Sequence, residues 1–328
     1  MEVALISTDP GREEATANPS GLHQMMTTQE AVHAALTAAG HNVQHIVLPP
    51  RANLDPLHRC EAEVVFNLVT GVVDKRMQLY SVALMEMTGL NFVGADLRTH
   101  VVCLDKGVTK ALLRAGGIPT PAYRVIRGGQ DPEPADEDLP FPVLVKPAGG
   151  GSSLGITRES VVWDPVSLDR RVEQLRWEFP GDIVVEQFLP GREFTVGILG
   201  NGDARVFPLQ EITYANWPAD EPPIYSFRAK VEERAGRECP ARVDADLGAE
   251  IERIALATFR LLGLRDLARL DIRLDAGGRP HVLEVNALPG LQPGYSEYPR
   301  MAQTGGLSYE DLIDSLVQCC ATRAKLGQ

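Results

Sequence analysis

Short apolar runs alternate with amphipathic helical stretches along the first 97 residues, and this alternation constrains the fold of the chain most strongly. Thr27 and Glu30 have the spacing of a capping box, which predicts a helix that begins there and is closed by Gly40. A second helix is predicted over residues 77–87. Because strands that alternate with helices form parallel sheets, this region is predicted to be a small Rossmann-like α/β unit. The apolar runs that supply its strands are residues 2–7, 43–48, 64–68 and 91–93.

The rest of the chain mixes strands and helices in a less regular order, which is typical of an α+β arrangement. The stretch 214–246 is polar, contains prolines and shows no period, so it is predicted to be a long loop of the kind that is usually functional. Residues 268–274 and 280–286 are predicted to form a hairpin around Gly277 and Gly278. Other strands are expected at residues 143–147, 182–186 and 193–199, and other helices at 106–115, 246–262 and 309–321.

Charge and cysteine usage exclude several classes of protein. The 328 residues carry 32 Lys and Arg against 44 Asp and Glu, a net charge of -12, whereas binding of nucleic acid through its phosphates needs positive charge. Five cysteines without a C-x-x-C spacing indicate a reducing compartment. The first residues are too few and too acidic for a signal peptide, and no run approaches the roughly 18 apolar residues that span a bilayer. We therefore expect a cytoplasmic protein with neither nucleic acid nor membrane as a partner.

A glycine run at residues 149–155 has the composition of a phosphate-binding loop. Its glycines let backbone N–H groups converge on a ligand, and Ser152 and Ser153 add two hydroxyls. The run lacks the G-x-x-x-x-G-K spacing of a Walker loop, and a flexible hairpin is an equal alternative for the run alone. Lys146 lies three residues upstream on an apolar strand, where a lysine without a ligand would be costly. The combination favours an anionic ligand.

Lysine is scarce in this chain, since six of the 32 cationic residues are lysines. The compact charge of lysine suits phosphate oxygens. Lys106, Lys146 and Lys230 stand where a phosphate site could use them, and a plain surface role is the alternative for Lys106 and Lys230.

The predicted hairpin carries a cluster of oxygen ligands. The two-residue spacing places Arg269 and Asp271 on one face of their strand, and Glu284 and Asn286 on one face of the next. Pairing of the strands can bring Asp271, Glu284 and Asn286 together, and such donors suit Mg²⁺ that also holds substrate phosphates. A solvent-facing strand of alternating charge is the alternative, but Leu283 and its apolar neighbours indicate a buried region.

Other patterns are less specific. Glu186 and Glu193 flank a turn whose backbone groups could pair with a purine edge while a carboxylate binds ribose hydroxyls, although a surface turn is the default interpretation. The seven histidines show no metal-binding spacing. No G-x-S-x-G elbow is present, so the sequence offers no nucleophile for hydrolase chemistry.

Taken in order, these motifs resemble the ATP-grasp superfamily and, within it, the D-alanine:D-alanine ligase family. The motifs cover nearly the whole chain and are specific in combination. The resemblance implies an ATP-grasp fold with an N-terminal Rossmann-like parallel α/β domain at residues 1–98, a central subdomain at 99–189 and a C-terminal catalytic subdomain at 190–328. The matching segments are Leu104-Asp-Lys106, Val145-Lys-Pro147, Gly151-Ser-Ser-Leu-Gly155, Val185-Glu186, Glu193-Phe-Thr195, Ala229-Lys230, Arg269-Leu-Asp271, Glu284-Val-Asn286 and Leu288-Pro-Gly290, followed by Ser296.

The resemblance implies a site for ATP. Lys106 and Lys146 would hold the α and β phosphates under the loop, and Lys230 would reach the γ phosphate as its own long loop closes. Glu193 would hold the ribose. The other implied nucleotide contacts are Gly151, Ser152 and Ser153 at the phosphates, Glu186, Gln187, Phe188 and Leu189 at the adenine, and Leu283.

The resemblance also implies the reacting end of the site. Asp271, Glu284 and Asn286 would bind two Mg²⁺ ions, for which Mn²⁺ is a substitute. Since family members are often homodimers, a homodimer is expected. The residues implied in catalysis or in binding two small amino acids are Arg269 and the N–H of Gly290 in an oxyanion hole, Lys230 and Ser152 near the phosphates, Ser296 at the carboxylate of the second amino acid, and Glu14, beside Glu13, at the substrate.

The implied reaction joins a carboxylate to an amine. The carboxylate attacks the γ phosphorus to give an acyl phosphate and ADP, while metal ions and lysines neutralise the developing charge. The amine then attacks the activated carbonyl, and the oxyanion meets preorganised donors as phosphate leaves. Closing the 214–246 loop would exclude water that hydrolyses the acyl phosphate.

Four departures from the family pattern lie at the amino-acid end, and one of them is the longer insert through Ser20 that follows Glu13 and Glu14. Thr70 and Gly71 stand where cell-wall ligases usually carry a His-Gly, Val231 stands where a tyrosine commonly follows the loop lysine, and residues 291–295 lengthen the path from Gly290 to Ser296. These departures leave open a ligase for another amino-acid pair or for a larger or carrier-bound acceptor. A non-catalytic ATP-binding regulatory protein is the alternative of another class.

Overall fold

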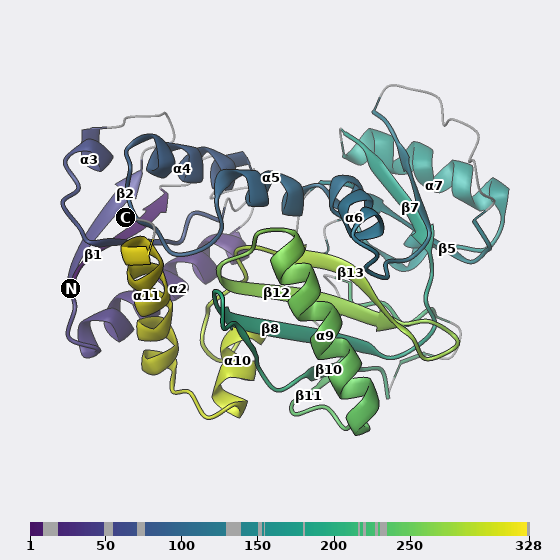
Figure 1. Ribbon diagram of the computed structural model, residues 1–328. Coiled ribbons are helices and arrows are strands. Elements are labelled where there is room, and N and C mark those ends of the chain that lie inside the picture. The colour runs from purple at the N-terminus through teal and green to yellow at the C-terminus, as the bar shows by residue number, and fades with distance from the viewer. Residues whose placement is uncertain are drawn as a thin grey trace.

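The computed structural model describes residues 1–8, 19–48, 55–70, 76–128, 139–149, 153, 155–179, 181–215, 217–218, 221–226, 229 and 235–326. These residues form three sheets with helices packed against them (Figure 1). Among them, no helix combines the length and the apolar character that crossing a membrane requires.

The first sheet is N-terminal and parallel, as predicted, with the strand order β2-β1-β3. Its strands are apolar and buried along most of β1 and all of β3, because helices cover them. The elements are β1 (Glu2–Thr8), α2 (Pro19–Ala38), β2 (Asn42–Leu48), α3 (Asp55–His58), β3 (Val64–Asn67) and α4 (Arg76–Met87).

Two details of this region differ from the prediction. Helix α2 starts at Pro19, so Thr27 lies inside it and its Oγ1 donates to the carbonyl oxygen of His23 at 3.0 Å. The predicted cap at Thr27 is therefore wrong, because a threonine hydroxyl bonded four residues back is compatible with a helix interior. The predicted strand at 91–93 is a single bridge between Phe92 and Val65.

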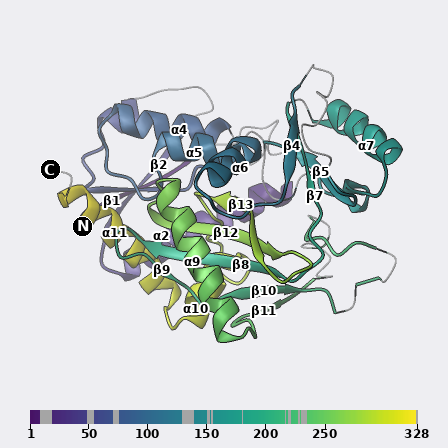
Figure 2. The ribbon, with the colours of Figure 1, turned by 45° about the vertical axis from the view of Figure 1, so that its right-hand side comes forward.

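The second sheet is antiparallel and lies at one side of the molecule, where helix α7 packs against it (Figures 1 and 2). Leu168, Val172 and Leu175 bury one face of α7 against the sheet. The strands, in the order β4-β7-β5-β6, are β4 (Tyr123–Ile126), β5 (Val143–Pro147), β6 (Val161–Val162) and β7 (Ile183–Gln187). The helices of this part of the chain are α5 (Leu97–Leu104), α6 (Lys106–Ala115), the 3₁₀ turn η1 (Arg158–Ser160) and α7 (Pro165–Glu178).

The third sheet has six strands in the order β11-β10-β8-β12-β13, with β9 paired to β8. The predicted hairpin is confirmed, since β12 and β13 are antiparallel neighbours. Helix α9 packs on β8, β9 and β12, and α10 and α11 also contact the sheet. The elements are β8 (Glu193–Gly200), β9 (Arg205–Val206), β10 (Gln210–Thr213), β11 (Gly236–Glu238), α9 (Ala245–Leu261), β12 (Asp266–Leu274), β13 (Pro280–Asn286), α10 (Glu297–Thr304) and α11 (Tyr309–Leu326).

The segment between β7 and β8 crosses from the second sheet to the third. It is therefore not a hairpin, although the sequence reads as strand, turn and strand. The predicted loop at 214–246 is also interrupted, because β11 pairs with β10. Strand β11 has three residues, which is too short for its period to be visible in the sequence.

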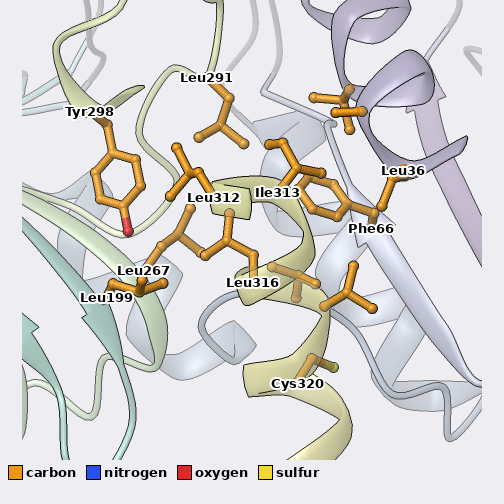
Figure 3. Close-up of a cluster of buried hydrophobic side chains, with 14 of the residues drawn as sticks. Leu36, Phe66, Leu199, Leu267, Leu291, Tyr298, Leu312, Ile313, Leu316 and Cys320 are labelled. Carbon is orange, nitrogen blue, oxygen red and sulfur yellow. The ribbon is translucent and has the colours of Figure 1, made fainter. Parts of the chain in front are cut away.

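One hydrophobic core joins the N-terminal sheet to the C-terminal helices. Leu36 of α2 and Phe66 of β3 lie in the same cluster as Leu312 and Leu316 of α11, and all four side chains are buried (Figure 3). Tyr298 of α10 extends this cluster toward the third sheet, where its hydroxyl donates to the carbonyl oxygen of Ile198 at 2.9 Å. The N-terminal unit thus shares its core with helices about 240 residues further along the chain.

A buried carboxylate strengthens the same junction. Asp266 is fully buried and has a left-handed backbone, with φ of 62°. Its oxygens accept hydrogen bonds from Gly94 N at 2.8 Å, Asn201 Nδ2 at 3.0 Å and Arg323 Nη2 at 2.9 Å. The side chain of Asp266 therefore joins three parts of the molecule. These are the segment that follows the first sheet, the third sheet, and α11.

Candidate active site

A pocket lies between the second and third sheets. Its volume is about 750 Å³ including the open mouth. Residues of β5 and β7 line one side, and residues of β8, β12 and β13 line the other. The predicted site residues that line it are Lys146, Ser153, Glu186, Gln187, Phe188, Leu189, Glu193, Arg269, Asp271, Leu283 and Glu284.

Two lysines and one glutamate form a buried ion cluster at the base of this pocket. Glu186 Oε1 accepts from Lys146 Nζ at 2.6 Å, and its Oε2 lies 2.7 Å from Lys110 Nζ. Burial raises the pKa of Glu186, but the two lysines outweigh this and hold it below its ordinary value. Burial lowers the pKa of Lys110 to about 8, against the attraction of Glu186. The cluster carries two positive charges and one negative charge, so it favours an additional anion.

Replacing Glu186 by Gln should lower stability, and it should also weaken nucleotide binding because Lys146 and Lys110 lose the carboxylate that holds them in position. The change leaves two buried lysines without a counter-charge, and breaking a buried pair in this way costs about 3 to 5 kcal/mol. Urea unfolding and calorimetric titration with ATP would measure the two effects. Glu211→Gln is the matched control, because Glu211 pairs with Arg192 near the surface and should cost less than about 1 kcal/mol. Equal losses in the two variants would contradict the expected role of the cluster.

Lys106 lies at the start of α6, next to the end of β5. Its backbone N–H donates to the carbonyl oxygen of Ala148 at 3.0 Å, and Asp105 caps the helix by accepting from Val108 N at 3.0 Å. The side chain of Lys106 is buried, and its Nζ lies 3.7 Å from Glu284 Oε1. Two predicted phosphate lysines, Lys106 and Lys146, thus approach the pocket from different elements.

The hairpin face is arranged as its spacing predicts. Asp271 pairs directly with Glu284, and Arg269 pairs with Asn286. Asp271 Oδ2 accepts from Arg269 Nη2 at 3.0 Å and lies 3.4 Å from Asn286 Nδ2, while its Oδ1 accepts from Thr195 Oγ1 at 3.2 Å. Structure and spacing therefore agree that these oxygen donors share one face.

The donor set has the chemistry of a magnesium site. Asp271 and Glu284 supply carboxylate oxygens, Asn286 supplies an amide oxygen, and both carboxylates remain partly exposed in the pocket. Arg269 Nε is buried without a hydrogen-bond partner among the described residues, so this end of the pocket can also accept an anionic oxygen. Burial lowers the pKa of Arg269, but Asp271 outweighs this, and the pKa lies above its ordinary value. The guanidinium therefore stays charged.

At the other end of the pocket, some backbone donors are already used in hydrogen bonds within the protein. The backbone N–H groups of Gln187 and Phe188 donate to the carbonyl oxygens of Ala122 and Pro142, at 2.8 and 3.0 Å. Because those donors are taken, a purine edge would have to use other backbone groups of this segment. Leu283 and Leu189 contribute apolar surface to the walls.

Glu193 is held by its neighbours in the pocket wall. Its Oε2 accepts from Arg273 Nη1 at 3.0 Å and from the hydroxyl of Tyr214 at 2.7 Å. Arg273 also lies over the ring of Phe188, with its Cζ 4.9 Å from the ring centroid. These contacts fix the carboxylate in one orientation at the edge of the pocket.

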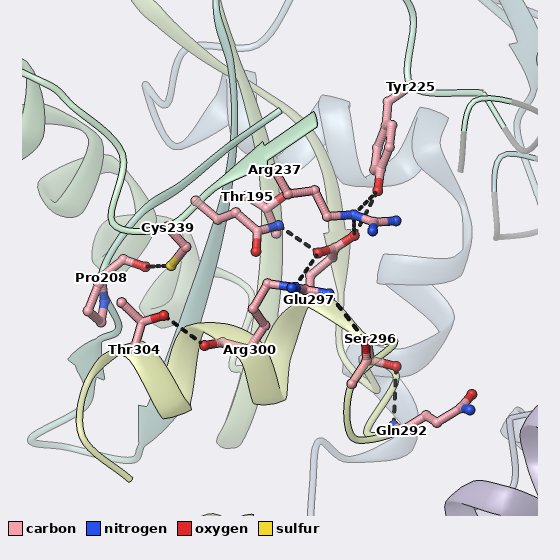
Figure 4. A network of polar contacts seen from close by, with 12 residues as sticks. Thr195, Pro208, Tyr225, Arg237, Cys239, Gln292, Ser296, Glu297, Arg300 and Thr304 are labelled. Carbon is pink, nitrogen blue, oxygen red and sulfur yellow. Dashed lines mark hydrogen bonds and ion pairs between the residues drawn. The ribbon is translucent and has the colours of Figure 1, made fainter. Parts of the chain in front are cut away.

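Gly290 and Ser296 lie side by side despite the intervening residues. A Cβ atom added to Gly290 would lie 2.8 Å from Ser296 Oγ, so a side chain at position 290 would force the hydroxyl of Ser296 to move. Ser296 Oγ accepts from Gln292 N at 3.1 Å, and the 291–295 insertion folds back on itself (Figure 4). The lengthened path therefore leaves these two predicted substrate residues adjacent.

Comparisons with known proteins identify the family of this chain. Residues 112–318 match the family model described as D-ala D-ala ligase C-terminus. The chain is 33% identical over 319 residues to a D-alanine--D-alanine ligase of Mycobacterium sp. (strain KMS), covering 95% of this chain and 83% of the relative. The chain belongs to the D-alanine–D-alanine ligase family. A further family relative is the uncharacterized protein y4sG of Sinorhizobium fredii, 33% identical over 297 residues, or 90% of this chain and 85% of the relative.

Solved structures confirm the predicted ATP-grasp fold for this member of the family. The D-alanine--D-alanine ligase of Bacillus anthracis, solved in complex with ATP, superposes with a TM-score of 0.78, and the match covers 100% of both chains. The sequence identity is 22%, so this likeness concerns the fold.

Not every predicted residue can be placed in this ligase-family fold. Glu14, Gly151, Ser152 and Lys230 lie outside the described residues. Arg273 and Tyr225 also line the pocket, although neither was predicted to be a site residue. The position of Arg273 in the pocket could have been predicted, because Arg273 continues the alternation of Arg269 and Asp271 along one strand face. No sequence pattern predicts the position of Tyr225, since it lies in a segment without periodicity.

Proposed function

We propose that this enzyme is an ATP-dependent ligase that joins two D-alanine molecules by a C–N bond, releasing ADP and phosphate. One observation carries the proposal: the pocket sets the buried Lys146 and Glu186 pair opposite Arg269, Asp271 and Glu284 of the hairpin. A nucleotide and a reacting carboxyl group need such charges at opposite sides of one site. The relatives named as D-alanine--D-alanine ligases support the choice of amino acid.

In this proposal the phosphates of ATP lie over the lysines. Lys146 and Lys106 bind the α and β phosphates, since the buried cluster around Glu186 has one positive charge in excess. Gly151, Ser152 and Ser153 contribute to the same phosphates, and Lys230 reaches the γ phosphate. The adenine lies along the segment of Glu186, Gln187, Phe188 and Leu189, with Leu283 on the opposite wall and Glu193 at the ribose.

Asp271, Glu284 and Asn286 are proposed to hold two Mg²⁺ ions, which Mn²⁺ can replace. When bound, these ions neutralise charge on the phosphates as the γ phosphoryl group is transferred. Asp271 also orients Arg269 through the 3.0 Å contact. Arg269 therefore presents its guanidinium in a fixed direction toward the reacting centre.

The amino-acid end completes the proposed chemistry. The carboxylate of the first D-alanine attacks the γ phosphorus, which forms an acyl phosphate and ADP. The amine of the second D-alanine attacks the acyl carbon, and phosphate leaves as the C–N bond forms. Arg269 and the N–H of Gly290 stabilise the oxyanion, Ser296 binds the carboxylate of the second amino acid, and Glu14 faces the substrate. We further propose the three domains 1–98, 99–189 and 190–328, a homodimer and a cytoplasmic location.

Product analysis with a panel of amino acids tests the proposal. The protein with MgATP is mixed with single D- and L-amino acids and with pairs, and ADP release is compared with products identified by mass spectrometry. D-alanine alone should give the dipeptide with one ADP for each bond. Turnover only with another pair, or only with a larger acceptor, would replace D-alanine as the substrate. ATP binding without turnover would favour the regulatory alternative.

A further inference from the structure

Tyr225 connects two parts of the site that are about 140 residues apart in the sequence. Its carbonyl oxygen accepts from Ser153 Oγ, in the glycine-rich segment, at 3.0 Å. Its hydroxyl donates to Glu297 Oε1 at 2.7 Å, and Glu297 follows Ser296 directly. One residue therefore contacts both Ser153 at the proposed phosphate end and the residue that follows Ser296, which is proposed to bind the second amino acid.

The contact with Ser153 stabilises an uncommon backbone conformation. Ser153 has a φ of 58°, in the left-handed region that residues other than glycine adopt rarely. Such a conformation persists where surrounding contacts hold it. The hydrogen bond to the Tyr225 carbonyl is one such contact, so a displacement of Tyr225 is transmitted to the glycine-rich segment.

The contact with Glu297 is part of a larger buried network (Figure 4). Glu297 Oε1 lies 3.0 Å from Arg237 Nε, and Oε2 accepts from Gln210 Nε2 at 2.6 Å. Arg237 Nε also lies 3.0 Å from the Tyr225 hydroxyl oxygen. Glu297 is nine-tenths buried and its oxygens are used by these protein partners, so it anchors the start of α10 rather than binding substrate.

Tyr225 keeps its proton in this setting. Burial, followed by the negative charge of Glu297, raises its pKa well above the ordinary value of a tyrosine. The hydroxyl is therefore a permanent donor to Glu297 at neutral pH. Hydrogen bonds to charged groups contribute more than neutral ones, about 1.5 to 3 kcal/mol.

We propose that Tyr225 is a positioning residue that couples the nucleotide end of the site to the acceptor end, an inference that rests on the proposed function. A nucleotide that fixes Ser153 in place also fixes Tyr225, and Glu297 transmits this restraint to Ser296. Binding of ATP thereby prepares the site for the second amino acid before the acyl phosphate forms. By reciprocity, the second amino acid strengthens the hold on the nucleotide.

Hydrogen exchange with a non-hydrolysable ATP analogue and Mg²⁺ tests the coupling without any turnover. In the wild type, the analogue should slow exchange of the amides around Lys146 and also, by at least about fivefold, those of residues 291–304. In Tyr225→Phe, which removes only the hydroxyl, protection around Lys146 should remain and the slowing at 291–304 should fall to less than about twofold. Tyr225→Phe is preferred to Glu297→Ala, which leaves Arg237 and Gln210 unpaired and could prevent folding.

Tyr298→Phe is the matched control. It also removes one buried tyrosine hydroxyl, bonded to Ile198, but it does not touch the link between Ser153 and Glu297. In Tyr298→Phe, the ATP analogue should still slow amide exchange at residues 291–304, even if the substitution lowers the stability of the protein. The inference is overturned if Tyr225→Phe keeps the full slowing, if both variants lose it equally, or if the wild type shows protection only around Lys146. No protection around Lys146 in the wild type would overturn the proposed nucleotide site, and this inference with it.

Discussion

Asp271→Asn is expected to reduce kcat by about 10³-fold while the protein remains folded. The substitution keeps the shape of the side chain but removes a charge from the face shared with Glu284 and Asn286. It also removes the negative partner of Arg269, which lies 3.0 Å away. A loss of this size corresponds to about 4 kcal/mol of transition-state stabilisation, which is typical for a charge beside a transferring phosphoryl group.

Steady-state ADP release at saturating substrates, across a range of Mg²⁺ concentrations, measures this effect. Asp275→Asn is the control, because Asp275 lies on the same hairpin but accepts from the turn amides of Gly277 and Arg279, away from the pocket. It should keep kcat within about twofold. A kcat for Asp271→Asn close to that of the wild type would remove Asp271 from the proposed metal site.

Asp266→Asn should cause a large loss of stability, about 3 to 5 kcal/mol in the free energy of unfolding. Asparagine tolerates the left-handed backbone at this position, so the change isolates the effect of the charge. The variant would leave Arg323 without its buried counter-charge and would set an amide NH₂ against the donor from either Gly94 or Asn201, which bind different oxygens of Asp266. Urea unfolding followed by circular dichroism gives the value.

Asp314→Asn is the comparison for this prediction. Asp314 also joins the N-terminal unit to α11, through a 2.9 Å contact with His41, but its side chain is 36% exposed. Water can solvate the partners of a half-exposed pair, so the loss should stay below about 1 kcal/mol. Similar losses in the two variants would contradict the assignment of Asp266 as the buried anchor.

The sequence predicts best those features that depend on local periodicity. The alternation of Arg269 with Asp271 and of Glu284 with Asn286 placed these side chains on shared faces, and the strand register agrees. The parallel N-terminal sheet followed from the same kind of pattern. Predictions from strong periodicity agree with the structure because the apolar residues of a strand or helix determine which face is buried.

Contacts between distant segments could not be predicted in this way. Lys110 and Lys146 meet at Glu186 because α6, β5 and β7 pack together, and no spacing in the sequence reports that packing. Short elements were missed as well: α10 has eight residues and carries Pro299 in its first turn. The prediction at Thr27 failed for the opposite reason. The local sequence has a capping pattern, but the helix begins earlier and Thr27 lies in its interior.

The shared core of Figure 3 has a consequence for synthesis on the ribosome. When β3 leaves the exit tunnel, α2 covers only part of one face of the first sheet, because α11 has yet to be translated. At about 5 to 20 residues per second, that face waits roughly ten to fifty seconds. During this interval Phe66 and its neighbours are exposed, so the nascent chain is a natural client for a chaperone until the last helix arrives.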